Sequence, residues 1–305
     1  MARAPLPVRD GLNPSRVRLP ESGPWPTTLG YLRQRFYGDE QRLAEKVAAA
    51  EVVDATGTPV DEHTPFVADS FVFLYRDPAP EVRVPFELEV LFADEHLLVV
   101  DKPHFLATTP RGAYVVESAT VRLRRDRGEP DLSPVHRLDR VTAGVLIFSR
   151  RPAERGAYQE LFARRQVRKS YRAVAPFRPD LTFPLDVASR IVKERGTPTA
   201  EEVPGEPNAH TRIELLEVRG PLGHYALHPS TGRTHQLRVQ LNSLGLPIRF
   251  DPFYPRLLDV DPTDYSRPLQ LLARSVGFAD PLTGQHREFV SRRSLSEWPT
   301  DTEPR

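Results

Sequence analysis

One carboxylate set among cations is the first feature of this sequence that could do chemistry. In the stretch HRLDR, residues 136–140, Asp139 lies between Arg137 and Arg140. A neighbouring cation stabilises the ionised form of a carboxylate, and an ionised carboxylate in a shaped pocket can act as a nucleophile or a general base. Taken alone, however, the cluster favours a structural ion pair over a catalytic group.

A tyrosine and further cations follow this cluster along the chain. Lys169 and Tyr171 lie in a predicted strand, where the two-residue period places both on one face. There the ring could stack on a nucleobase while the cation meets a phosphate. Arg233, after Gly232, begins a predicted helix, which suits an anion, and it could reach Asp139. The structural alternatives are a half-buried strand tyrosine and a surface arginine at a capped helix.

The residue types and patterns that are missing exclude several classes of chemistry. The chain has no cysteine, which excludes disulfides, thiolate zinc sites and cysteine nucleophiles. It has no phosphate-binding or dinucleotide-binding glycine pattern and no G-x-S-x-G turn. His224 and His228 lie four residues apart but lack the intervening glutamate of a zinc protease. We therefore expect neither a metal nor a cofactor.

The distribution of charge is more informative than its total. The 305 residues carry a net charge of only +1. From Val121 to Arg172, however, fourteen Lys and Arg residues stand against six Asp and Glu residues. A basic centre in a near-neutral chain favours a polyanionic ligand; a solvated charged surface is the alternative. No apolar run approaches the ~18 residues of a membrane span, and the N-terminus lacks a secretory signal, so we expect a cytoplasmic protein without a membrane partner.

The sequence divides into three regions. Residues 1–84 predict a small α+β extension, in which two helices precede short strands. A linker at 76–85 leads into the main domain, residues 85–294. Residues 295–305 are expected to form an acidic, flexible tail.

The main domain alternates strands with helices, which predicts an α+β fold with a largely antiparallel sheet. Thr234 and Gly245 are suitable caps for the last helix. A surface loop is predicted at 195–209. Strands are predicted at 86–92, 96–103, 144–149, 167–175, 210–218 and 224–229, and helices at 116–125, 151–166 and between the two caps.

The three polar clusters become specific when they are taken in order with their flanking motifs. HRLDRVTAG (136–144), KSY (169–171) and TGRTHQLRVQL (231–241), followed by GLPIRFDPFY (245–254), closely resemble the RluA family of pseudouridine synthases. LLVVDKP upstream and LLARSVGFADPLTG downstream are similar to the opening and closing motifs of that family. The resemblance covers residues 86–290.

The resemblance implies the pseudouridine synthase fold, a largely antiparallel mixed sheet flanked by helices. It also implies an isomerase that breaks the N1–C1′ bond of a uridine in RNA, turns the base and forms a C5–C1′ bond. Attack of a carboxylate on C1′, removal of the C2′ proton and attack on C6 of the base are alternative first steps. None of them needs a metal or a cofactor.

The resemblance also assigns roles to individual residues. Asp139 is the essential nucleophile, Tyr171 stacks on the target base and is the candidate for removing the C5 proton, and Arg233 pairs with Asp139. Arg137 fills the gap that a flipped nucleotide leaves. Flipping is required because a carboxylate cannot reach C1′ of a stacked, paired nucleotide. The expected substrate-binding residues are Arg137, Arg140, Lys169, His235 and Leu272.

A few positions depart from the family's usual residues. Ala143 replaces a serine, Gln240 replaces a histidine, and Arg249-Phe250 replace a small residue and a glycine. The stretch at Leu272 lacks a usual histidine. The three main catalytic positions are nevertheless present, so we expect activity.

The expected protein is a monomeric RNA pseudouridine synthase that acts on rRNA, with tRNA as the second candidate. Residues 1–84 weakly resemble the small RNA-binding domain that often precedes this catalytic domain, although a divergent or decorative extension is the alternative. One rival function is a non-catalytic RNA-binding or ribosome-assembly protein that uses the same basic cleft. Another is a glycosidase that uses Asp139 on a different glycosidic bond.

Overall fold

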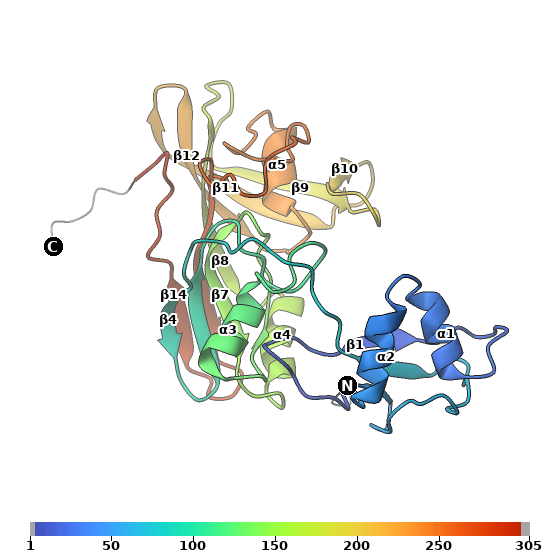
Figure 1. Cartoon of the computed structure of the whole chain (residues 1–305). Coiled ribbons are helices and arrows are strands. Elements are labelled where there is room, and N and C mark those ends of the chain that lie inside the picture. Colours follow the sequence, from blue (N-terminus) through green and yellow to red (C-terminus); the bar gives the residue numbers. More distant parts are fainter. Residues whose placement is uncertain (1–3, 300–305) are drawn as a thin grey trace. The chain divides into compact units, whose positions relative to one another are not determined.

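The computed structural model describes residues 4–299, which form two compact units (Figure 1). The first unit contains the described residues up to Glu81 together with Val121–Pro130. The second contains Val82–Thr120 and the described residues from Asp131 onward. The segment Val121–Pro130 thus belongs with the N-terminal unit, although the sequence places it inside the main domain. No helix within residues 4–299 is long and apolar enough to cross a membrane.

The N-terminal unit packs two helices against a three-stranded antiparallel sheet of order β1-β3-β2. The side chain of Thr27 caps the first helix by accepting a hydrogen bond from the Gly30 amide at 3.2 Å. Leu29, Leu32 and Leu43 bury the inner faces of the helices. Both predicted helices are present; the first strand was not predicted. The elements are β1 (Ser15–Arg18), α1 (Thr28–Arg35), α2 (Glu40–Ala48), β2 (Val52–Asp54) and β3 (Phe71–Leu74).

The second unit is built on an eleven-stranded, mostly antiparallel sheet, which confirms the predicted α+β class. Its path runs β10-β9-β11-β12-β8-β13-β7-β5-β4, with β14 paired to β13 and β6 to β7. The strands are β4 (Glu89–Ala93), β5 (Leu97–Lys102), β6 (Ser133–Pro134), β7 (Ala143–Ser149), β8 (Arg168–Pro176), β9 (Leu185–Val192), β10 (Glu201–Val203), β11 (Ala209–Arg219), β12 (Leu222–Pro229), β13 (Leu271–Ala279) and β14 (His286–Val290).

Hydrophobic patterning explains why β5 and β7 lie inside the sheet. All residues of β5 and β7 are buried, as continuous apolar runs predict for central strands. Helix α4 (Arg155–Ala163) buries Tyr158 and Leu161 against this part of the sheet. Helix α5 (Gln236–Ser243) packs on the part formed by β8, β11 and β12 (Figure 1). Most of helix α3 (Ala119–Arg127) belongs instead to the segment Val121–Pro130 of the first unit.

Strand β13 joins the half of the sheet that contains β8 to the half that contains β7. It pairs antiparallel with β8 on one side and parallel with β7 on the other. The parallel contact is short, with Leu272 opposite Ala143 and Ala273 opposite Gly144. A Cβ atom on Gly144 would lie 2.2 Å from the Ala273 carbonyl oxygen, and its φ of +116° favours glycine. Glycine at this position therefore permits the close approach of the strands.

The end of the described chain is packed, so the prediction of a flexible tail from residue 295 is wrong for residues 295–299. Leu295 and Trp298 are 2% and 4% exposed, and they cluster with Ala143, Val174 and Leu272. Their large apolar surfaces outweigh the acidic composition of the segment. The rest of the predicted tail, 300–305, lies outside the described residues.

Two local predictions in the main domain need correction. The residue that precedes α5 is His235, in a left-handed conformation with φ of +56°, so Thr234 is not the cap. Instead the Gln236 side chain accepts a hydrogen bond from the Arg233 amide at 3.0 Å. Gly245, at φ of +73°, follows the helix as predicted. Strand β10 lies within the predicted surface loop 195–209, where it pairs with β9.

Candidate active site

A cavity of about 860 Å³ lies across the junction of the two half-sheets. The loop after β5 and the loop before β7 form one wall of the cavity. Strand β8, the β12–α5 loop and α5 form the other wall. Leu271 of β13 contributes between them. The charged residues of the lining are very unequal in sign: Asp139 is its one carboxylate, whereas its cations are Arg111, Arg137, Arg140, Arg165, Lys169, Lys193, Arg233 and Arg238.

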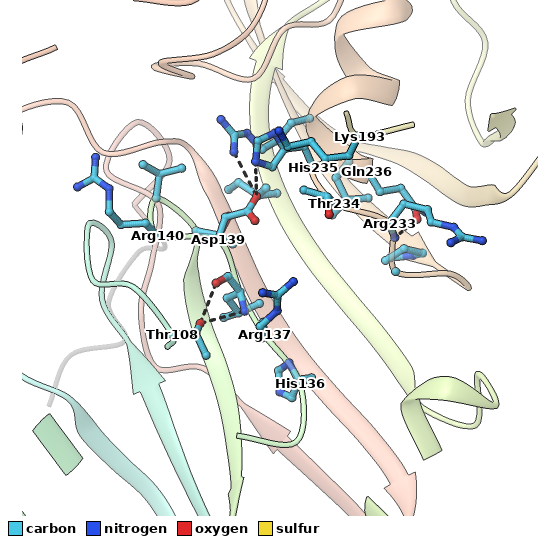
Figure 2. Close-up of a pocket in the computed structure, with 18 of the residues that line it drawn as sticks. Thr108, His136, Arg137, Asp139, Arg140, Lys193, Arg233, Thr234, His235 and Gln236 are labelled. Carbon is cyan, nitrogen blue, oxygen red and sulfur yellow. Dashed lines mark hydrogen bonds and ion pairs between the residues drawn. The ribbon is translucent and has the colours of Figure 1, made fainter. Parts of the chain in front are cut away.

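Hydrogen bonds between uncharged groups hold the loop that carries Asp139 in place. Thr108 accepts from the Leu138 amide at 3.1 Å and donates to the Leu138 carbonyl at 2.7 Å (Figure 2). The Thr142 amide donates to the Asp139 carbonyl at 3.1 Å and closes a turn. His136 accepts from the Ile147 amide at 3.2 Å. Both Leu138 and Asp139 line the cavity, but Leu138 is buried whereas the Asp139 side chain is 32% exposed.

His136 is a structural residue of this loop. Its ring stacks on Phe162, with centroids 4.6 Å apart. Burial lowers its pKa to about 3, so the ring is neutral and can accept the Ile147 hydrogen bond through Nε2. The first histidine of HRLD thus holds the loop on β7 and supplies no charge to the cavity.

Asp139 forms an ion pair with Arg238 of α5. The Arg238 guanidinium donates to Asp139 Oδ2 at 3.1 Å and makes two further hydrogen bonds to Asp251, at 2.7 Å and 2.6 Å. Arg238 and Asp251 are almost wholly buried, whereas the Asp139 side chain is 32% exposed. Burial alone would lower the pKa of Arg238, but the hydrogen bonds and charges of the two carboxylates raise it. The arginine is therefore a permanent cation beside Asp139.

The prediction that Arg233 pairs with Asp139 is wrong. Arg233 is exposed, and its Nε donates to the Asn208 carbonyl at 3.2 Å, on the far side of the cavity from Asp139 (Figure 2). The physical reason is its position ahead of α5, in a loop that turns outward before His235. Arg238 lies in the first turn of the helix, on the face that contacts the Asp139 loop. Both arginines line the cavity, but only Arg238 contacts the carboxylate.

His235 lies on the other side of the same carboxylate oxygen, with Nε2 3.8 Å from Asp139 Oδ2. Its Nδ1 is 3.0 Å from the Tyr254 hydroxyl, which donates to the Ala200 carbonyl at 2.9 Å. Burial, and to a smaller extent the nearby Arg238 charge, lower the His235 pKa to about 4 against the opposing effect of Asp139. The imidazole is therefore neutral near pH 7, and its contact with Asp139 is not a charge pair.

Tyr171 lines the cavity from β8, as its motif predicts. Its hydroxyl has no hydrogen-bond partner among residues 4–299. Burial, and then the negative charge of Asp139, raise its pKa above the ordinary value. The phenol is therefore protonated before a substrate binds, and the ring offers a flat apolar face beside the carboxylate.

The predicted RNA-contacting cations surround the carboxylate on different sides. Arg137 is exposed and points away from Arg140, on the opposite side of Asp139 (Figure 2). Arg140 lies over the ring of Tyr114, with 4.6 Å between the guanidinium carbon and the ring centroid. Lys169 donates to the Thr231 carbonyl at 2.6 Å. Burial, and then the charge of Arg165, lower the pKa of Lys169 to about 8.

Leu272 does not line the cavity, so the structure contradicts its predicted role in substrate binding. It is 2% exposed and packs against Ala143 and Trp298 on the other face of the sheet. The two-residue period of β13 sends Leu271 to the cavity instead. The motif located the correct segment, but the residue of that segment that lines the cavity is Leu271.

Sequence reasoning missed Arg238, although a signal was available. Leu237 and Leu241 form the apolar side of α5, and Arg238 lies between them. An arginine at such a position is rarely buried unless an acid pairs with it. Asp251, in the motif DPFY that follows the helix, is the buried partner. The presence of an arginine in the apolar stripe was thus evidence for an internal ion pair.

The structure accommodates two departures from the family's usual residues. Gln240 is fully buried; it accepts from Thr211 at 2.6 Å and donates to Ser189 at 3.1 Å, so its polar groups are satisfied. Phe250 adopts φ of +61°, the conformation in which a glycine is usual. A side chain there costs about 1–2 kcal/mol. The Arg249 guanidinium, 4.6 Å from the Phe250 ring centroid, compensates part of this strain.

Metal chemistry was not expected from the sequence. Among residues 4–299, no group of three or more His, Asp or Glu side chains is arranged to hold a metal ion.

Comparisons with known proteins identify the family. The sequence profile described as RNA pseudouridylate synthase matches residues 96–243. The dual-specificity RNA pseudouridine synthase RluA of Salmonella typhi is 31% identical over 66% of this chain and 91% of its own length. The mitochondrial tRNA pseudouridine(32) synthase of Saccharomyces cerevisiae is 29% identical over 59% of this chain and 39% of its own length.

A solved structure agrees with these matches. The human RNA pseudouridylate synthase domain containing 4 superposes with a TM-score of 0.51 at 26% identity, covering 67% of this chain and 88% of its own. The predicted family is therefore confirmed by profile, sequence and fold together. The chain belongs to the RluA-type family of pseudouridine synthases, isomerases that convert uridine to pseudouridine.

Proposed function

We propose that this enzyme isomerises specific uridines in RNA with Asp139 as its nucleophile. The observation that carries the proposal is the excess of cations over carboxylates in the cavity lining, where Asp139 faces a set of Lys and Arg side chains. Apart from Arg238, none of the lining cations has a carboxylate within 4 Å among residues 4–299. Unpaired cations around a cavity of nucleoside size suit the phosphates of a bound strand.

The contacts of Asp139 support its proposed role. Arg238 and His235 both approach Oδ2, whereas Oδ1 has no polar partner among the described residues. One oxygen is thus held in place while the other is free to meet the sugar of a flipped uridine. The Arg238 cation orients the carboxylate through its hydrogen bond to Oδ2, and the face of Tyr171 supports the base while the N1–C1′ bond breaks and the C5–C1′ bond forms.

The remaining groups are proposed to position the strand. Arg137 occupies the gap left by the flipped nucleotide, and Arg140, Lys169 and Arg233 contact phosphates or bases. We propose rRNA as the substrate, with tRNA second; the yeast relative that acts on tRNA supports the second candidate. We also propose that the enzyme is a monomer and that it acts in the cytoplasm.

Tritium release tests the proposal directly, because the C5 hydrogen is lost when the C5–C1′ bond forms. rRNA and tRNA transcripts that carry tritium at uridine C5 are incubated with wild type and with Asp139→Asn. We expect release by wild type and a loss of at least about 10³-fold in the variant, as for other nucleophile substitutions. Asp186→Asn, at an exposed carboxylate outside the cavity, is the matched control.

Two other results would contradict the proposal. RNA binding by wild type without release from any transcript would assign the protein to the non-catalytic class. Free uracil among the products would show hydrolysis of the glycosidic bond and a glycosidase. Mapping pseudouridines in the cellular RNA of a deletion strain then identifies the target uridine.

A further inference from the structure

Tyr114 and Arg140 form a flat surface that lines the cavity, and the proposed mechanism gives Tyr114 no role. The Arg140 guanidinium carbon lies 4.6 Å from the centroid of the Tyr114 ring, and both residues line the cavity. Arg140 follows Asp139 directly, so this surface adjoins the nucleophile. Arg140 lies on the opposite side of Asp139 from Arg137 (Figure 2). We refer to these two residues as the stacking pair.

The backbone holds both members of the stacking pair in position without a ligand. Arg111 and Tyr114 exchange backbone hydrogen bonds of 2.8 Å and 3.1 Å, which close a tight turn around Gly112 at φ of +59°. The Arg140 carbonyl accepts from the buried Lys102 amine at 3.3 Å, and its guanidinium donates to the Phe105 carbonyl at 3.4 Å. The two flat groups are therefore preorganised.

An ion pair does not explain the position of Arg140. Among residues 4–299 it has no carboxylate within 4 Å, and neither has its neighbour Arg111. Its contacts are one aromatic face and one long hydrogen bond to a carbonyl. A planar, weakly hydrated guanidinium that is stacked on a ring and left unpaired offers its charge and its plane to a ligand.

We propose that the stacking pair is a second nucleobase subsite, which binds the base adjacent to the flipped uridine in the RNA strand. The inference rests on the proposed function and adds a determinant of sequence preference to it. Aromatic rings and arginine planes are the usual platforms for unpaired bases of single-stranded RNA. A purine overlaps such a surface more fully than a pyrimidine, so the subsite favours a purine at this position.

Fluorescence of 2-aminopurine tests the subsite. The probes are two RNA hairpins with one uridine in the loop, which carry 2-aminopurine on its 5′ or its 3′ side. Wild type is expected to quench one probe of the two on binding. Tyr114→Ala is expected to abolish this quenching and to weaken binding by about ten-fold, the effect of one lost base stack. Tyr114→Phe retains the ring and is expected to retain both signals.

A second variant separates stacking from charge. Arg140→Lys keeps the positive charge and loses the plane, so reduced quenching with Lys supports stacking rather than phosphate contact. Thermal melting of each variant reports folding. Tyr114→Ala that quenches and binds like wild type, while wild type releases tritium from the transcripts, would overturn the subsite and leave the proposed function standing. Absence of release from every transcript with wild type would instead overturn the proposed function, and the subsite with it.

Discussion

Arg238 contacts two carboxylates, and the two contacts have different consequences. The paired hydrogen bonds to Asp251 are wholly buried and belong to the core. The single hydrogen bond to Asp139 ends at a side chain that faces the cavity. One residue thus links the stability of the fold to the orientation of the proposed nucleophile.

Replacing this arginine should therefore affect folding as well as activity. Arg238→Ala leaves the Asp251 carboxylate buried without its cation, which should lower the free energy of unfolding by about 3–5 kcal/mol. Arg233→Ala, at an exposed side chain of the same segment, should change it by less than about 0.5 kcal/mol. Urea denaturation of both variants measures the difference. Equal losses of unfolding free energy in the two variants would contradict the assignment of Arg238 as the buried partner of Asp251.

Lys169 predicts a pH dependence of RNA binding. Burial and the Arg165 charge hold its pKa at about 8, and the facing groups are Arg165, the Thr231 carbonyl and the neutral His136 ring. As the pH rises through about 8, the amine loses its charge and its attraction for a phosphate. Affinity should fall by up to about ten-fold, the effect of one charged hydrogen bond.

The matched variant for this prediction is Lys169→Arg, which stays protonated at every pH of interest. Binding of one rRNA transcript is measured at fixed ionic strength from about pH 7 to about pH 9. The variant should show a flatter profile than wild type. A fall of the same size in both proteins would assign the pH dependence to another group.

At the scale of the elements, the contact of β7 with β13 determines where the Asp139 loop lies. Gly144→Ala would bring its Cβ within 2.2 Å of the Ala273 carbonyl oxygen and force a methyl group into a left-handed conformation. The free energy of unfolding should fall by at least about 2 kcal/mol, and activity should fall with it because the loop shifts. Gly156→Ala is the control: Gly156 lies in α4 with open space around it.

The control should change stability in the opposite direction. Gly156 is the second residue of α4, and alanine is favoured over glycine in a helix by up to about 1 kcal/mol, so Gly156→Ala should raise the midpoint of denaturation slightly. Both variants are compared by thermal melting and by tritium release. If the Gly144→Ala protein were as stable and as active as wild type, the close contact of β7 with β13 would not be needed for stability or activity.

Many elements were predictable from the sequence, although strands β9, β13 and β14 were not predicted, and the site was predictable in part. Strands β5 and β7 follow from continuous apolar runs, and α4 follows from its helical spacing. The partner of Asp139 was missed because Arg233 and Arg238 both belong to one motif. Only the left-handed turn at His235 decides which of them faces inward. The face of Leu272 was missed because β13 is buried on both sides, so its pattern carries no alternation.

At the scale of the whole molecule, the net charge of +1 conceals a basic cavity. RNA binding should therefore depend steeply on salt. Each neutralised phosphate contributes about 0.7 to 0.9 to the slope of log K against log salt concentration. Arg165→Ala removes one unpaired cation of the lining and should make the slope shallower by about that amount.

Arg164 provides a matched control for the salt experiment. It precedes Arg165 but pairs with Glu160 at 2.6 Å and does not line the cavity. Arg164→Ala should leave the slope unchanged in titrations of the same transcript. A larger effect of Arg164 than of Arg165 would place the RNA path outside the cavity.

The position of β13 has a consequence for truncated chains. This strand comes late in the chain, yet it lies between β8 and β7 and joins the half-sheet of Asp139 to the half-sheet of Tyr171 and Arg238. A chain that lacks Leu271–Ala279 has both walls of the cavity but no strand to hold them together. We therefore expect chains that stop before β13 to be inactive toward RNA.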